Sequence, residues 1–238
     1  MQTLQIVITL ASPVLLDTLS FFDGILAWCA VRDAHGDLSV IERLPLKSTG
    51  GVYHASWGLE SREKLPIVAD PRYITKRGLD ADMDPSKDDL ARYLDLDQVK
   101  PTHLLAGAGQ YKGFLFALHP IAPRQVTFWA AGDGDEVRRL LQKHLAYLGA
   151  KGTLGFGRIE NIDVTSTPED CSLVHDGQVM RPIPTSALAL LDPKVQAVLK
   201  GWPLGVSRVM PPYWARTGLV ECFMPRKKSL PVIEKKAA

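Results

Sequence analysis

Four glycines within ten residues make one short segment of this sequence well suited to binding a polyanion. Residues 149–158 read Gly-Ala-Lys-Gly-Thr-Leu-Gly-Phe-Gly-Arg. Glycine leaves the backbone N–H groups unobstructed, so a sugar-phosphate chain can approach them closely without its bases being read. Lysine and arginine add positive charge at the rim. We therefore predict a phosphate-binding loop formed by Gly149, Lys151, Gly152, Gly155, Phe156, Gly157 and Arg158.

The elements around this loop exclude two well-known glycine motifs. A dinucleotide-binding glycine loop follows a strand and opens a helix, whereas this loop is expected to follow a helix and open a strand. The segment also lacks the Gly-Lys-Ser/Thr ending of a nucleotide-binding P-loop. A helix C-cap followed by a simple turn remains an alternative interpretation of the same residues.

The helix before the loop has the clearest pattern in the sequence. Its apolar positions recur at helical spacing, and Gly149 stands where the helix is expected to stop. These apolar positions are Val137, Leu140, Leu141, Leu145 and Leu148. Residues 114–118 and 125–130 before the helix, and residues 159–164 after the loop, are rich in strand-forming side chains.

The first half of the chain shows a similar succession. Residues 4–10 alternate like a buried strand, and Asp23 is placed to cap a helix that residues 35–37 end. Residues 38–44 and 51–57 are predicted strands, and the charged residues 60–100 are interpreted as an insertion with its own lobe. After Pro168 the sequence predicts no regular element.

Composition narrows the class of protein. The 238 residues are 46% hydrophobic and 23% charged, which suits one large domain or two small packed ones. The net charge is only +2, so any nucleic-acid site must come from local clustering. Three scattered cysteines form neither a disulfide framework nor a zinc motif. With no signal-like segment and no apolar run long enough to cross a bilayer, a soluble cytoplasmic protein without cofactor or membrane partner is expected.

Three stretches together resemble a known family. The ending Gly-Phe-Gly-Arg at 155–158, after the last helix of a ferredoxin-like unit, resembles the signature loop of CRISPR-associated RAMP proteins. Phe-Asp-Gly-Ile-Leu-Ala-Trp at 22–28, and Gly-Gln-Tyr-Lys-Gly-Phe at 109–114 upstream of 126–133, are similar to the Cas-five-like (Csf-three) subunit of type IV systems. The resemblance extends from residue 4 to about residue 164.

This resemblance implies an α+β protein with a tandem ferredoxin-like (RRM-related) RAMP fold. The core would comprise residues 1–59 and 101–238 as two packed units, with residues 60–100 as an inserted thumb-like lobe. It also implies a non-catalytic subunit of a CRISPR ribonucleoprotein that binds the 5′ handle of the crRNA. Such a subunit caps the filament of repeating backbone subunits, contacts the large subunit, and acts on target DNA only indirectly.

Further candidates for RNA contact lie outside the loop. Lys47, Tyr53 and His54 fall on or beside one predicted strand pair, where a cation and aromatic faces suit a phosphate and a stacked base. Tyr53, like the nearby Trp57, fits core packing equally well. Arg72, Lys76 and Arg77 concentrate charge in the insertion, although such a run also fits a solvated face. Lys112, within 109–114, completes the set.

Two weaker patterns leave alternatives open. Residues 208–216 place arginines, Tyr213 and Trp214 around two prolines, which suits base stacking or a packed loop. An enzymatic alternative is the crRNA-processing endonuclease of the same superfamily, with His54 and Tyr53 as acid and base. Among the other histidines, His119 and His144 have no partner at a telling spacing, and no His-based metal motif is present.

Overall fold

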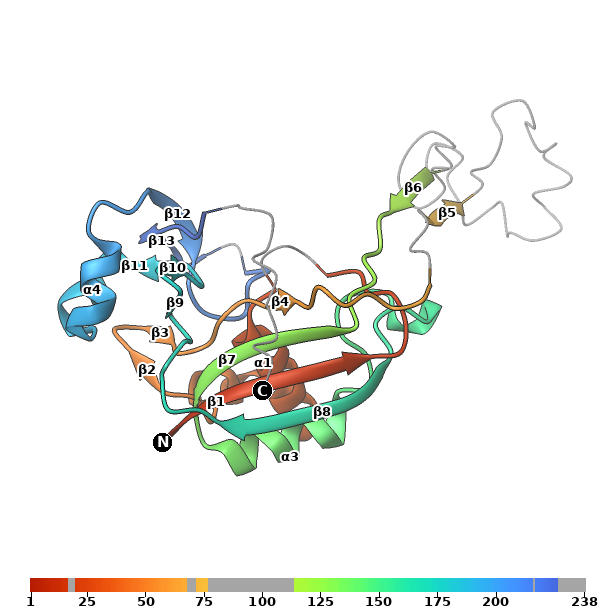
Figure 1. The fold of residues 1–238 in the computed structure, drawn as a ribbon, viewed down its shortest axis with the longest axis horizontal. Helices are drawn as coiled ribbons and strands as arrows, with labels where there is room; N and C mark the ends of the chain where they lie inside the picture. The colour runs from red at the N-terminus through yellow and green to blue at the C-terminus, as the bar shows by residue number, and fades with distance from the viewer. Residues whose placement is uncertain (17–19, 68–71, 77–113, 216, 227–238) are drawn as a thin grey trace, which may run out of the picture. The chain divides into compact units, whose positions relative to one another are not determined.

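The chain forms two compact units in the computed structural model, which describes residues 1–16, 20–67, 72–76, 114–215 and 217–226. One unit comprises residues 1–69 and 121–238, and the other residues 70–120 (Figure 1). Helices and strands are both present, and all described strand pairs are antiparallel, which confirms the predicted α+β class. None of the helices in these ranges is long and apolar enough to cross a membrane.

The larger unit is built on a four-stranded sheet with the first strand of the chain in its interior. β1 (Gln2–Leu10) lies between β7 (Gln125–Gly132) and β8 (Ile159–Ser166), and β4 (Leu59–Glu60) pairs with the far side of β7 (Figure 1). Ile6 is opposite Phe128 on one side and Val164 on the other. The segments that looked like two successive units in the sequence therefore share one sheet.

Two helices pack against each other below this sheet (Figure 1). α1 (Phe22–Asp33) follows β1, and α3 (Gly134–His144) links β7 to β8, so the elements succeed one another as βαββαβ. The carboxylate of Asp133 caps α3 by accepting hydrogen bonds from the N–H groups of Asp135 and Glu136 at 3.1 and 3.2 Å. The alternating residues of β1 and the apolar stripe of α3 form the core between the layers.

The predicted stop of α3 is wrong, because the helix ends at His144 and not at Gly149. Leu145 already has an extended backbone. Leu145 and Leu148 are nevertheless buried, at 8% and 0% exposure, because the chain after the helix turns back onto the core. The helical spacing of apolar residues thus continues beyond the helix. This spacing alone does not show where the backbone hydrogen bonds of the helix end.

Three predictions in the first half are also corrected. Residues 38–44 form the 3₁₀ helix η1 (Leu38–Arg43) and not a strand, since Asp37 caps it through the N–H of Ser39 at 2.9 Å. Asp23 does not cap α1. The N-cap position is Phe21, and Asp23 is fully buried in the first turn. Of residues 51–57, only β3 (Val52–Tyr53) is a strand, paired with β2 (Ser48–Thr49).

The residues after Pro168 are more ordered than the sequence predicted. They form the hairpin β9 (Val174–His175) and β10 (Gln178–Val179), then a three-stranded sheet of β11 (Ile183–Pro184), β13 (Leu219–Phe223) and β12 (Leu204–Arg208). The 3₁₀ helix η5 (Thr185–Leu190) and α4 (Pro193–Leu199) lie between β11 and β12. In the smaller unit, β5 (Arg72–Lys76) pairs with β6 (Phe114–Leu118), with Ile74 opposite Phe116.

Candidate nucleic-acid interface

The glycine-rich segment 149–158 is an exposed loop between α3 and β8. It contains one short 3₁₀ turn, η4 (Gly152–Leu154), and most of its residues are open to solvent. Gly152 and Phe156 are half-buried, and Gly157 is buried. Most residues of the loop are therefore open to solvent, although several of their backbone N–H groups are hydrogen-bonded within the protein.

A short segment after β1 fixes the shape of the loop. The hydroxyl of Ser12 donates to the carbonyl oxygen of Gly155 at 2.7 Å and accepts from the N–H of Arg158 at 2.8 Å. The N–H of Gly157 donates to the carbonyl oxygen of Pro13 at 2.7 Å, and that of Ala150 to Leu15 at 2.9 Å. Four hydrogen bonds from one segment hold both ends of the loop in place.

Glycine is required at two positions of the loop for steric reasons. Gly149 and Gly157 have φ values of 78° and 67°, which side-chain-bearing residues rarely adopt. A Cβ at Gly149 would lie 2.3 Å from the carbonyl oxygen of Leu15, and one at Gly157 would lie 1.9 Å from that of Leu148. These two glycines let the loop lie directly against neighbouring backbone.

The outer part of the loop has unused hydrogen-bond donors and positive charge. The N–H groups of Lys151, Gly152 and Thr153 donate to no acceptor in the described part of the chain. Lys151 and Arg158 are exposed, and neither forms an ion pair with a described carboxylate. Tyr147, whose ring packs over Gly152, is 44% exposed beside them. Free amides, two cations and an aromatic ring are the groups that hold a nucleotide chain.

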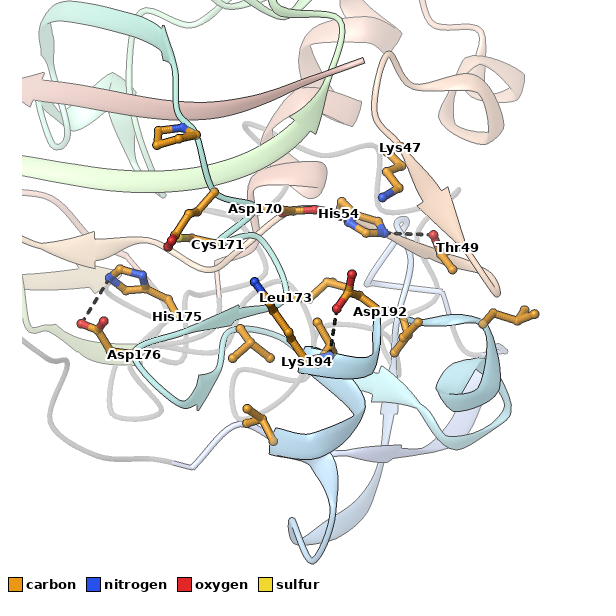
Figure 2. A pocket seen from close by; sticks show the side chains of 17 residues that line it. Lys47, Thr49, His54, Asp170, Cys171, Leu173, His175, Asp176, Asp192 and Lys194 are labelled. Atoms are coloured by element: carbon orange, nitrogen blue, oxygen red, sulfur yellow. Dashed lines mark hydrogen bonds and ion pairs between the residues drawn. The ribbon is translucent and has the colours of Figure 1, made fainter.

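Lys47, Tyr53 and His54 do not form one surface. The Tyr53 ring is 2% exposed, and its hydroxyl donates to the carbonyl oxygen of Ile41 at 2.8 Å. Burial raises the pKa of Tyr53, so its proton is held firmly. A ring inside the core has no free face for stacking on a base. Lys47 and His54 instead line a pocket together with residues from the segment after β8 (Figure 2).

His54 is held by hydrogen bonds on both sides of its ring. Its Nδ1 is 2.8 Å from Oδ2 of Asp170, and its Nε2 is 2.9 Å from the hydroxyl of Thr49 (Figure 2). Burial raises the pKa of Asp170, but the hydrogen bonds from His54 and Ser172 outweigh it and lower that pKa to about 2. The Asp170 carboxylate is therefore ionised and fixes the His54 imidazole.

The remaining predicted RNA contacts lie in or near the smaller unit. Arg72 and Lys76 are the first and last residues of β5, and Tyr73 between them is 63% exposed. Arg77 and Lys112 lie outside the described residues, as does Arg216. The structure thus places Arg72 and Lys76 on one strand and leaves the proposed basic cluster as a prediction.

The weaker candidates are divided between core and surface. Arg181 is fully buried and bound to Asp23, while Tyr213 donates its hydroxyl to the same carboxylate at 2.8 Å. Trp214 is 77% exposed. Nε2 of His144 is 2.8 Å from the carboxylate of Asp33, which also forms ion pairs with Arg139 and Lys143. No three His, Cys, Asp or Glu side chains of the described ranges are grouped as metal ligands.

Sequence reasoning missed two residues that organise these sites. Ser12 was seen only as the end of a strand, and Asp170 only as part of an irregular region. Ser12 is 146 residues from its partner Arg158, and Asp170 is 116 residues from His54. No local pattern marks contacts over such distances. For Ser12, the sequence does offer one signal. A Ser-Pro pair directly after a strand indicates a turn, in which the serine hydroxyl is free to form a hydrogen bond with another segment.

Comparison with known protein families gives a match. A family model described as CRISPR type IV associated protein Csf3 matches residues 80–225, which is more than half of the chain. The matched range includes β7, α3, the loop 149–158, β8 and the segment that carries Asp170. A search of curated proteins found no match.

Proposed function

Because this chain belongs to the Csf3 family of CRISPR type IV associated proteins, we propose that it is a non-catalytic subunit that binds the 5′ handle of the crRNA. The observation that carries the proposal is the exposed loop 149–158, with its free amides beside Lys151 and Arg158. Backbone amides and cations bind phosphates whatever the base sequence. A subunit that must accept many guides needs such recognition.

The fold supports the same assignment. The βαββαβ succession, with β1 between β7 and β8, is the order expected of a ferredoxin-like unit. We assign the loop to the position between the last helix and the last strand of that unit. The separate compact unit of residues 70–120 supports an inserted thumb-like lobe near the predicted range 60–100. The roles of filament cap and of partner to the large subunit and backbone subunits belong to this proposal.

Lys47, Tyr53 and His54 are not needed for handle binding at the loop. Loop residue Arg158 immediately precedes β8, while Asp170, the partner of His54, follows the last residue of that strand. Eight residues of strand span roughly 26 Å at about 3.3 Å per residue. The handle surface therefore consists of the loop, with Tyr147 as its stacking ring.

The test is retention of crRNA by the assembled complex. We expect the double variant Lys151→Ala/Arg158→Ala to lose roughly tenfold or more in affinity, because two charge-assisted phosphate contacts are removed. Lys200→Ala is the control, because this substitution also removes a positive charge, and Lys200 is exposed at the end of α4. Circular dichroism verifies the fold of each variant. Unchanged retention in the double variant would refute the assignment of the handle to this loop.

The endonuclease alternative predicts a different result. Tyr53 cannot reach a bound RNA from the core, so His54 would act without the partner that the sequence suggested. Purified protein is incubated with repeat RNA in the absence of metal ions. We expect no specific cleavage. Cleavage that His54→Ala abolishes would overturn the non-catalytic assignment.

A further inference from the structure

A second site is separate from the glycine loop. A pocket of about 620 Å³ lies in the larger unit, where the β2–β3 hairpin, the segment 168–176 after β8, and α4 meet (Figure 2). Its volume falls within the range of roughly 300–1,000 Å³ that is usual for sites of small ligands. Nothing in handle binding uses these residues.

Two ammonium groups enter the pocket from opposite walls. Lys47 precedes β2 and Lys194 lies in the first turn of α4, and Figure 2 shows both side chains directed into the cavity. Neither forms an ion pair with a carboxylate in the described part of the chain. Two unpaired cations that face one cavity favour an anionic group between them.

The carboxylates of the pocket limit the charge of that anion. Asp170 accepts from His54 and Ser172, Asp176 is 3.6 Å from Nε2 of His175, and one oxygen of Asp192 accepts from the backbone of α4 at 2.8 Å. Glu169 is exposed at the rim. Four carboxylates near two lysines repel a triphosphate more strongly than a monophosphate. A phosphate monoester carries at most two negative charges, which the two ammonium groups can offset locally, whereas a triphosphate would add charge that nothing in the pocket offsets.

Part of the pocket wall is apolar. Leu173 and Leu191 are 2% and 5% exposed, and Val195 and Val198 pack against them from α4. On the opposite side lie the fixed His54 ring and the Thr49 hydroxyl. The free oxygen of the Asp192 carboxylate points into the cavity, where it can accept a hydrogen bond from an exocyclic amine.

We infer that this pocket binds a nucleoside monophosphate, with its phosphate between Lys47 and Lys194 and its base against the apolar wall of α4. His54, held by Asp170 and Thr49, positions the polar side of the ligand. The monophosphate is either a free nucleotide or the phosphorylated terminal nucleotide of an RNA. The loop 149–158, beyond the other end of β8, takes no part in this binding.

Cys171 reports occupancy of the pocket. It lines the cavity and is half-buried, whereas Cys29 and Cys222 are buried elsewhere and serve as internal controls. The full-length protein is alkylated with N-ethylmaleimide, with and without AMP, CMP, GMP or UMP, and each cysteine is followed by mass spectrometry. We expect at least one monophosphate to slow modification of Cys171 several-fold in a saturable manner. Adenosine and ATP should protect less than AMP.

Matched variants test the two lysines. Lys47→Ala and Lys194→Ala should each weaken protection about tenfold, because each removes a charge-assisted contact with the phosphate. Lys200→Ala, which removes the same charge one residue beyond α4 and outside the pocket, should leave protection unchanged. Protection that persists in both lysine variants would overturn the proposed phosphate position.

A short RNA with a 5′-phosphate, compared with its dephosphorylated form, separates the two sources of the ligand. Protection by the phosphorylated RNA alone identifies an RNA end, and protection by free nucleotides alone identifies a metabolite. If neither slows the reaction of Cys171, the inference is wrong. These outcomes are independent of crRNA retention, which is measured on loop variants with this pocket intact.

Discussion

Asp23 and Arg181 form an ion pair in which both side chains are fully buried, with Nη2 of Arg181 3.0 Å from Oδ2 of Asp23. The guanidinium also donates to the carbonyl oxygens of Tyr53 and Ala55 at 2.8 and 3.1 Å. The pair links the first turn of α1 to the segment between β10 and β11. It therefore joins the N-terminal part of the core to the part that begins after β8.

Loss of one partner of this pair should be strongly destabilising. Asp23→Asn or Arg181→Met leaves the other charge buried without compensation, and we expect a loss of about 3–5 kcal/mol in the free energy of unfolding. The double variant Asp23→Leu/Arg181→Met should lose less than the sum of the single variants. Asp135→Asn is the control, because its surface pair with Arg138 contributes about 1 kcal/mol or less. Urea unfolding followed by tryptophan fluorescence gives all four values.

Two glycines of the loop should differ in their tolerance of alanine. Gly155 has φ of 87° with open space around it, so Gly155→Ala meets only backbone strain, about 1–2 kcal/mol. Gly157→Ala has the same type of strain and also places a Cβ 1.9 Å from the carbonyl oxygen of Leu148. We expect a clearly larger loss of thermal stability for Gly157→Ala. Equal losses would show that the backbone at Leu148 yields easily.

Handle binding should depend on salt in proportion to the phosphates contacted. For single-stranded nucleic acid, each contact contributes about 0.7 to the slope of log affinity against log salt concentration. Lys151→Ala and Arg158→Ala should each reduce the magnitude of the slope by about that amount. Lys200→Ala should leave it unchanged. The slopes are obtained by measuring the affinity for handle RNA by fluorescence anisotropy at salt concentrations from about 50 to about 300 mM.

The lowered pKa of Asp170 predicts a contribution to stability that depends on pH. A carboxyl whose pKa is lower in the folded protein stabilises it above the ordinary pKa of 3.8, and that contribution disappears as pH falls towards about 2. Wild-type protein should lose stability over this window, and Asp170→Asn should lose less over the same window. The pH dependence is tested by urea unfolding midpoints of both proteins at about pH 5, 4, 3 and 2, a range that includes both pKa values of Asp170.

The three thiols should react at different rates. Burial raises the pKa of Cys29 to about 12, and Cys222 is also buried, so both remain protonated at neutral pH. Burial, and to a lesser extent the nearby carboxylates, also raise the pKa of Cys171. Cys171 is nevertheless only half-buried, whereas the other two thiols are buried. We expect native-state alkylation in the order Cys171 before Cys29 and Cys222. In 6 M guanidinium, about the concentration that unfolds most domains, the three rates should converge.

Elements with strong local patterns could be predicted from the sequence. β1, β7 and β8 appear near their expected positions, since alternation and β-branched residues mark strands wherever they pair. The position of the loop 149–158 followed from its glycines. The ends of elements did not follow: Leu145 and Leu148 continue the helical spacing in residues that are no longer helical.

Long-range contacts explain what could not be predicted. Asp23 was predicted to cap a helix, but it lies in the first turn of α1 and its carboxylate is bound by Arg181, 158 residues later. His54 was recognised as a polar residue able to do chemistry, whereas Asp170, which fixes its ring, was not. Leu38 and Ile41 suggested a strand until the cap at Asp37 turned the same residues into a 3₁₀ helix. For Asp23 and His54 a contact far along the chain decided the outcome, whereas the cap at Asp37 is a local contact that the predicted strand overlooked.

The interior position of β1 in the sheet has a consequence for biosynthesis. β1 is translated first, yet β7 begins at Gln125 and β8 ends at Ser166. At about 5–20 residues per second, Ile6 and Ile8 wait roughly 8–30 s for both neighbours to emerge from the ribosome. During that time the nascent chain carries an apolar strand with two open edges. Chaperones that bind such strands would therefore meet this protein early, before the loop 149–158 has emerged.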